Sequence, residues 1–281
     1  LVIKSDPPLP PAGTEIAYQT VKISENIGKV VNLSDSEFTR ENYSMGMWRP
    51  IDFLEKVGGG LMMLQDYDKD KTPVIFLHGI GGGPTDLIAA IDNLDKKRFQ
   101  PWVLYYPSGF RLSVISDYFI QAVQQLQKRH SFRSFIVIAH SKGGLVTRSF
   151  IKKYTERFPG NEDDIQLVMT INSPIGGMTS AAIGVAISPI VVPSWRDINP
   201  ESDFFKDIYS WNWPSNIPYH LVFSYFDGDD TDGVVGLDSQ IPLKLQTEAT
   251  RIYGFNNNHV GTMHDDKFIK LFNSVLAKPT N

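Results

Sequence analysis

Short apolar runs that alternate with helical patterns constrain the fold of this chain more than any other feature. Four runs, each bounded by turn residues, occupy 72–79, 101–107, 132–140 and 165–173. Helical patterns lie between them, and the clearest, at 112–130, has apolar residues three and four positions apart. Apolar strands that alternate with helices predict an α/β fold, with a mostly parallel central sheet covered by helices on both faces.

The same alternation continues toward the end of the chain. Residues 219–226 and 249–255 are predicted strands, and 265–276 is the last predicted helix. Near the start, 14–24 and 28–33 alternate apolar and polar residues, which predicts two early strands.

The composition excludes several classes of protein. A net charge of −4 without basic runs gives no footprint for nucleic acid or for polybasic membrane attachment. The chain has no cysteine, which excludes disulfides, thiolate metal sites and a cysteine nucleophile. Because 42% of the residues are hydrophobic, we expect a folded domain with a sizeable core rather than a disordered chain.

A serine lies at a predicted strand-to-helix junction. The segment FIVIAHSKGGL, residues 135–145, passes from strand to helix at Ser141. A bend this sharp holds a hydroxyl clear of the sheet only if the residues two before and two after the serine are small. Ala139 and Gly143 meet this requirement, so Ser141 is the candidate nucleophile.

A glycine-rich turn, GIGGGPT at 79–85, ends the predicted strand one strand–helix–strand unit before the serine. Backbone N–H groups in such a turn suit the stabilisation of an oxyanion because they need no reorganisation. Phosphate binding is the alternative. However, the turn lacks the Lys-Ser/Thr ending of a P-loop, and Lys96, Lys97 and Arg98 occupy the region where a dinucleotide site needs an acid.

The segment Ala-His-Ser-Lys-Gly at 139–143 and the His-Gly turn resemble the nucleophile elbow and the oxyanion loop of α/β-hydrolases, in the form seen in bacterial lipases and esterases. The segments NSPIGGM and INPESDFFKDI are also similar to GPI-inositol deacylase-like proteins. The resemblance covers residues 60–278. It implies the α/β-hydrolase fold, and it assigns the oxyanion hole to the backbone N–H groups of Ile80 and Lys142.

The chain order serine, acid, histidine in α/β-hydrolases places the catalytic base after Ser141 and after the acid. Three histidines follow the serine: His220, His259 and His264. His259 lies between the last predicted strand and the last predicted helix, where this fold has its catalytic histidine. His264 is the alternative, although a position at a helix start explains it equally well. His220 opens a predicted strand and is expected to be structural.

The segment DGDDTDGVV, residues 227–235, offers the acid. Asp232 begins Asp-Gly-Val-Val, which resembles the loop that holds the catalytic acid in bacterial lipases, and Asp230 is the alternative. The aspartates also suggest calcium. An EF-hand does not fit, because Asp232 and Asp238 stand where that loop needs Gly and Glu. No metal is therefore predicted, and calcium bound in another geometry stays open.

Two parts of the chain fall outside the strand–helix alternation. Residues 1–13 are rich in proline and predict an extended tether before a single domain at 14–281. An insertion at about 175–216 is predicted to be a cap or lid beside the substrate pocket. The stretch Ile165–Trp195 has no charged side chain, which favours an apolar cap, although buried packing gives the same composition.

These features predict a serine hydrolase that cleaves carboxylic esters of apolar acyl groups through an acyl-enzyme, without a cofactor. An acyltransferase or thioesterase would use the same residues, and a non-catalytic binding module is a third hypothesis. The expected partner is a small-molecule or lipid ester and not nucleic acid. The proline tether and the missing initiator Met favour an exported protein, associated with a membrane surface if an anchor precedes this chain.

Overall fold

The computed structural model describes residues 26–179 and 192–277. The predicted tether at 1–13, the predicted strand at 14–24 and most of the apolar stretch of the insertion lie outside the described residues.

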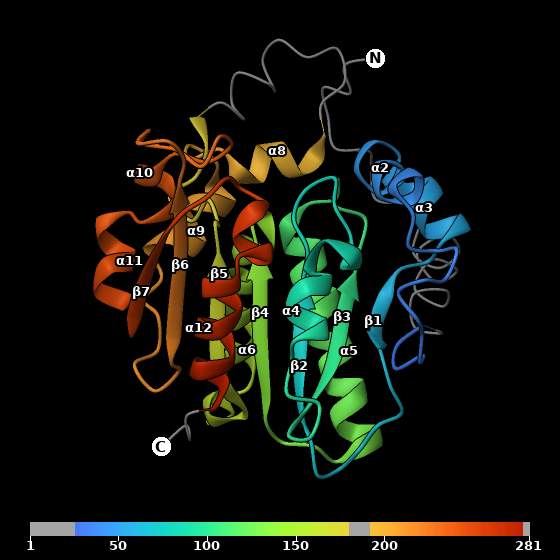
Figure 1. Ribbon diagram of the computed structural model, residues 1–281. Coiled ribbons are helices and arrows are strands. Elements are labelled where there is room, and N and C mark those ends of the chain that lie inside the picture. Colours follow the sequence, from blue (N-terminus) through green and yellow to red (C-terminus); the bar gives the residue numbers. More distant parts are fainter. Residues whose placement is uncertain (1–25, 180–191, 278–281) are drawn as a thin grey trace.

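Seven strands form one sheet in the order β1-β3-β2-β4-β5-β6-β7 (Figure 1). Only β1 is antiparallel to its neighbour, and every other pair is parallel. The prediction of a mostly parallel sheet is confirmed. The strands are β1 (Gly60–Met63), β2 (Thr72–Leu77), β3 (Phe99–Tyr105), β4 (Phe135–His140), β5 (Ile165–Ile171), β6 (Tyr219–Tyr225) and β7 (Arg251–Asn256).

Helices cover both faces of the sheet, as predicted. In Figure 1, α4 and α12 lie in front of the strands, and α5 and α6 lie behind them. Among the described residues, the α-helices are α2 (Arg40–Trp48), α3 (Pro50–Lys56), α4 (Ile88–Asp92), α5 (Leu112–His130), α6 (Lys142–Arg157), α8 (Pro193–Ile198), α9 (Asp203–Ser210), α10 (Leu237–Gln240), α11 (Leu243–Glu248) and α12 (Asp266–Ala277). Two hydrophobic clusters, one on each face, form the core.

Helix α5 shows why the strongest periodic pattern gave the right element. Its buried residues, which include Ile115, Phe119 and Leu126, recur at helical spacing and pack on one face of the sheet. The helix ends at Ser131, whose φ of 57° is left-handed and stops the regular hydrogen bonding. The observed bounds are those predicted from the sequence.

Two expectations about secondary structure were incomplete. The predicted strand at 28–33 forms only an isolated bridge between Val30 and Met63. The insertion at 175–216 contains α8 and α9, two helices that were not predicted from the sequence. Helix α9 begins at a local signal instead, because the Ser202 side chain accepts a hydrogen bond from the Phe205 amide.

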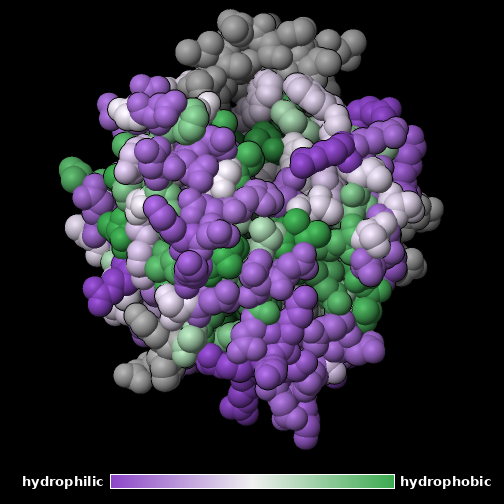
Figure 2. Space-filling model, in the orientation of Figure 1, coloured by the Kyte–Doolittle hydropathy of each residue, from purple (hydrophilic) through white to green (hydrophobic). Residues whose placement is uncertain are grey.

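The surface is mixed rather than uniformly apolar. Figure 2 shows hydrophilic residues over the lower part of one face and hydrophobic residues in separate patches on the same face. Within the described ranges, no helix combines the length and the apolar character that a bilayer crossing requires.

A buried ion pair ties α6 to the elements that follow the insertion. The Arg148 guanidinium is 2% exposed and contacts Glu248 at 2.7 Å. It also donates to the backbone oxygens of Ile208 and Trp211 at 2.7 Å each. With a second contact to Glu248, four of the five N–H groups of the guanidinium donate hydrogen bonds, and they connect α6 to α9, to the residue that follows it and to α11.

Replacing Glu248 with alanine is expected to lower the free energy of unfolding by about 3–5 kcal/mol, because it leaves the Arg148 charge buried without a partner. The matched control is Glu201→Ala. Glu201 pairs with Lys206 at the surface, with 81% of its side chain exposed, and its loss is expected to cost at most about 1 kcal/mol. Urea unfolding followed by circular dichroism measures both. Equal effects would contradict the buried-pair argument.

Candidate active site

Ser141 occupies a strained turn between β4 and α6. Its φ of 54° lies in the left-handed region that residues other than glycine avoid. The Ser141 amide donates to the Ile171 carbonyl of β5 at 2.8 Å, which holds the turn against the neighbouring strand. The serine is thus fixed at the carboxyl edge of the sheet, as the sequence predicts.

Small residues around the serine are required by close packing. A Cβ on Gly79 would lie 2.9 Å from Ser141 Cβ and 3.3 Å from its Oγ. A Cβ on Gly143 would lie 2.9 Å from the carbonyl oxygens of Leu77 and His78 on β2 and the turn after it. The prediction that the residue two after the serine must be small therefore has a specific cause. It faces the neighbouring backbone.

Asp232 and His259 form a buried pair. His259 Nδ1 lies 2.7 Å from Asp232 Oδ2, and the Asp232 side chain has no exposed surface. The other carboxylate oxygen accepts the Val234 and Val235 amides at 2.9 and 2.7 Å. Burial alone would raise the pKa of Asp232, but the hydrogen bond and charge of His259, with the two amides, outweigh it and leave that pKa lowered.

The backbone of the pair is fixed as firmly as its side chains. The His259 amide donates to the Asp232 carbonyl at 2.9 Å. The His259 carbonyl accepts from Asn172 Nδ2 at 2.9 Å and pairs with His140 Nε2 at 3.0 Å. His259 is therefore held by the loop that carries the acid and by the ends of β4 and β5.

The structure brings the three predicted residues to one edge of the sheet. Ser141 follows β4, Asp232 follows β6 and His259 follows β7. His140, next to the serine, has its ring centroid 4.8 Å from that of His259. Within the described residues the Ser141 hydroxyl makes no hydrogen bond, so it is not committed to a structural partner. A serine hydroxyl without a structural partner, at the same sheet edge as a buried His–Asp pair, has the chemical capacity for nucleophilic attack.

The predicted oxyanion donors belong to two segments beside the serine. Ile80 lies in the turn after β2, and Lys142 opens α6, where the helix dipole favours negative charge. Neither amide has an acceptor among the residues that the structure describes. Two unpaired N–H groups next to the Ser141 turn form an arrangement that can hold an oxyanion.

His78 supports the oxyanion turn. Its Nδ1 is 2.9 Å from the Gly79 carbonyl, and its ring stacks on Tyr106 at 4.1 Å between centroids. Burial lowers the pKa of His78 to about 3, and burial likewise lowers that of His140 to about 3. Both rings are therefore neutral at physiological pH and serve as fixed supports.

The alternatives considered from the sequence lie elsewhere. Asp230 and His264 are exposed. His220 Nδ1 pairs with the Tyr253 hydroxyl at 3.1 Å, on strands β6 and β7. In residues 26–179 and 192–277, no group of three or more histidines and acids is placed to hold a metal ion.

The side chain of Lys142 is a feature that the sequence did not reveal. It is 1% exposed, its Nζ donates to the Ser108 carbonyl, and it lies 5.2 Å from the Tyr106 ring centroid. Burial lowers the pKa of Lys142 to about 7, against the opposing charge of Asp197 on α8. The local sequence around Lys142, directly after Ser141, does not indicate that its side chain is buried. The burial depends on a contact with Ser108, which lies 34 residues away in the chain.

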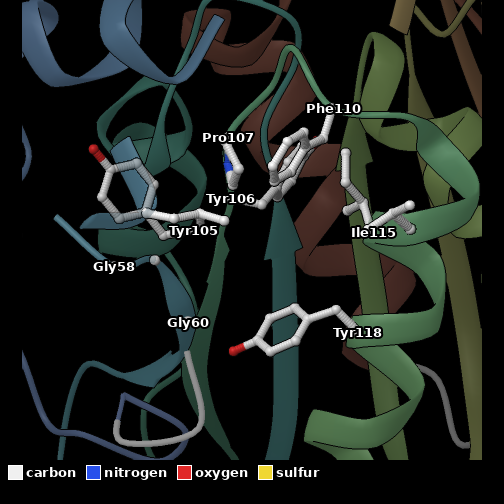
Figure 3. A pocket seen from close by; sticks show the side chains of 11 residues that line it. Gly58, Gly60, Tyr105, Tyr106, Pro107, Phe110, Ile115 and Tyr118 are labelled. Atoms are coloured by element: carbon white, nitrogen blue, oxygen red, sulfur yellow. The ribbon is translucent and has the colours of Figure 1, made fainter. Parts of the chain in front are cut away.

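A small apolar cavity of about 50 Å³ lies between the end of β3 and α5 (Figure 3). Its lining includes Tyr106 and Pro107, which follow β3, together with Phe110 just before α5 and Ile115 within α5. Tyr106 also stacks on His78, so one ring separates this cavity from the support of the oxyanion turn.

Comparison with known proteins identifies the family. Residues 111–254, half of the chain, match the family described as "Alpha/beta hydrolase of unknown function (DUF915)". The chain belongs to this family. The resemblance inferred from the elbow and the turn is thereby confirmed, and so is the α/β-hydrolase fold.

Individual relatives agree with this assignment. The chain is 28% identical over 102 residues to (Lyso)-N-acylphosphatidylethanolamine lipase of Mus musculus, a match that covers 32% of this chain and 28% of that protein. Among solved structures, the lin2722 gene product of Listeria innocua has a TM-score of 0.56 at 17% identity, covering 75% of this chain and 95% of that one. Mature lipase BlEst2 of Bacillus licheniformis has a TM-score of 0.59 at 15% identity, covering 75% and 94%. The two structures establish a shared fold.

The buried Lys142 amine predicts a pH dependence of stability. Its pKa is about 7 in the folded protein against an ordinary 10.5, so between these values the unfolded chain binds the extra proton. The contribution of Lys142 to the free energy of unfolding therefore rises as the pH increases from 7 to 10.5. The difference in unfolding free energy between wild type and Lys142→Met is expected to shift in favour of wild type over this range. Lys206→Met, at an exposed position, serves as control, and a parallel shift there would contradict the assignment.

Proposed function

We propose that this protein is a serine hydrolase that cleaves carboxylic esters, with Ser141 as nucleophile, His259 as general base and Asp232 as the acid that orients the base. The observation that supports this most directly is the buried 2.7 Å contact between Asp232 and His259 at the sheet edge where Ser141 occupies a strained turn. A serine hydroxyl alone is a poor nucleophile, and this pair supplies the base that it needs.

The first half of the reaction forms the acyl-enzyme. His259 Nε2 removes the proton from Ser141 Oγ as that oxygen attacks the ester carbonyl carbon. Asp232, hydrogen-bonded to Nδ1, stabilises the imidazolium that forms. His259 then gives the proton to the leaving alkoxide as the C–O bond breaks, and the alcohol departs.

The second half regenerates the enzyme. His259 removes a proton from water, and the hydroxide formed attacks the acyl carbonyl. The bond to Ser141 Oγ breaks, the serine recovers its proton from His259, and the carboxylic acid leaves. In both halves the negative oxygen of the tetrahedral intermediate is stabilised by the Ile80 and Lys142 amides. No cofactor takes part in these steps.

The substrate class is proposed from apolar character near the site. In the described stretches 165–179 and 192–195 no side chain is charged, and the cavity behind Tyr106 is lined by aliphatic and aromatic residues. Such surroundings penalise a charged acyl group and favour a hydrocarbon one. The partial match to a protein named as a phospholipid lipase supports the same class. We therefore propose esters of apolar acyl groups, including lipid esters.

We also propose one domain in which the insertion at about 175–216 forms the cap. Its described part packs near the site: the Ser194 amide donates to the Gly109 carbonyl at 3.1 Å, and Trp195 lies edge-on to Trp48 at 5.9 Å between centroids. These contacts place α8 against the turn that follows β3. A cap in this position restricts which acyl groups reach Ser141.

Ser141→Ala is expected to abolish hydrolysis of p-nitrophenyl esters from acetate to palmitate and to abolish labelling by a fluorophosphonate probe, because no oxygen remains to form the acyl-enzyme. Wild type should turn over these esters, and the chain-length profile measures the acyl pocket. Equal hydrolysis by both proteins would exclude the serine mechanism.

Asp232→Asn is expected to lower kcat by about 10⁴, because an amide neither stabilises the imidazolium nor keeps the histidine in the required tautomer. Asp230→Asn is the matched control: this aspartate lies two residues away and is exposed. Steady-state kinetics on the same ester compare the two. If Asp230→Asn lost the activity and Asp232→Asn kept it, the acid would have been assigned to the wrong residue.

A further inference from the structure

The turn after β3 contacts the oxyanion turn through Ser108. The Ser108 hydroxyl accepts a hydrogen bond from the Gly81 amide at 2.9 Å. Gly81 has a φ of 64° and follows Ile80 directly. Because the hydrogen bond fixes the orientation of the Gly81 peptide, it restricts the orientation of the neighbouring Ile80 amide.

The backbone of Ser108 also contacts Lys142, the residue whose amide is the second proposed donor. The Ser108 carbonyl accepts a hydrogen bond from Lys142 Nζ, and the Lys142 amide is the donor at the start of α6. Ser108 and Lys142 are each 1% exposed, so water does not compete for this contact. One residue therefore binds both segments that supply the oxyanion hole.

The turn that carries Ser108 is itself held from two further sides. The Gly109 amide donates to the Gly46 carbonyl of α2 at 2.9 Å, and the Gly109 carbonyl accepts from the Ser194 amide of α8 at 3.1 Å. The turn is also closely packed, because a Cβ on Gly109 would lie 2.1 Å from the Met47 carbonyl oxygen. The turn that carries Ser108 is thus held by hydrogen bonds to α2 and α8 and by close packing against α2.

We propose that Ser108 is a positioning residue that sets the geometry of the oxyanion hole by binding the turn of Ile80 and the side chain of Lys142 together. The inference rests on the proposed function. Donors stabilise an oxyanion only when they are held at 2.7–3.1 Å from the place where the charge forms, and the stabilisation is made in the transition state rather than in the bound substrate. Ser108 therefore acts on kcat and not on KM.

The test is Ser108→Ala, which removes the acceptor for the Gly81 amide and leaves the backbone in place. We expect kcat for a p-nitrophenyl ester to fall roughly 10- to 100-fold, less than the roughly 10²- to 10³-fold for loss of a donor, with KM unchanged within about threefold. Inhibition by a trifluoromethyl ketone, which adds to Ser141 and forms an oxyanion, should weaken by the same factor as kcat/KM. A role in folding alone would not move these two quantities together.

Ser116→Ala is the matched control. Ser116 is as buried as Ser108, and its hydroxyl contacts Ser113 and Ser149 between α5 and α6, away from the oxyanion turn. We expect this variant to keep kcat and inhibitor affinity. If Ser108→Ala matched Ser116→Ala in both, the inference would be overturned.

Lys142→Met decides the question if Ser108→Ala does not fold. It keeps the backbone amide and a side chain of similar length but removes the contact with the Ser108 carbonyl. A fall in kcat and in ketone affinity by one common factor supports the inference, and unchanged values overturn it. Ser141→Ala, measured beside these variants, separates the two proposals. If Ser141→Ala retains activity, the serine mechanism is wrong and the role of Ser108 is wrong with it. If Ser141→Ala loses activity and Ser108→Ala does not change it, only the role of Ser108 is overturned.

Discussion

The strained turn at Ser141 is the constraint on which the rest of the site depends. A φ of 54° at a residue with a side chain costs about 1–3 kcal/mol and persists only where the surroundings over-determine it. Here the surroundings are the β5 carbonyl that binds the Ser141 amide and the backbone of β2 pressed against Gly143. The parallel sheet provides both, because it aligns the carboxyl ends of β2, β4 and β5.

The same alignment brings the other groups within reach. Asp232, His259 and the oxyanion turn each follow a strand and lie at the same edge of the sheet, where the carboxyl ends of parallel strands meet. Two neutral, buried histidines complete the arrangement by hydrogen-bonding backbone carbonyls of the turn and of the His259 loop. Imidazole serves here as a support for the backbone, in addition to the role of base proposed for His259.

Sequence alone predicted what local patterns encode. Apolar runs and helical periodicity gave the sheet and α5, and the small residues around Ser141 indicated the elbow. The sequence did not indicate the burial of Lys142 or the hydrogen bond between Ser108 and Gly81, because those contacts join turns 34 and 27 residues apart that no local pattern connects. Helices α10 and α11 were missed for a different reason. With four and six residues, they are too short to show a period.

Most contacts at the site join distant parts of the chain. Asp232 and His259 are 27 residues apart, Tyr43 and Thr85 are 42 apart, and the ring of His140 meets the backbone of His259 across 119 residues. Contacts of long sequence separation form late in folding, because the loops that they close cost entropy first. The site is thus complete only when β2, β4, β5, β6 and β7 have come together. In a refolding experiment, the proposed turnover is therefore expected to recover after the circular dichroism signal, because local helices contribute to that signal before the sheet is complete.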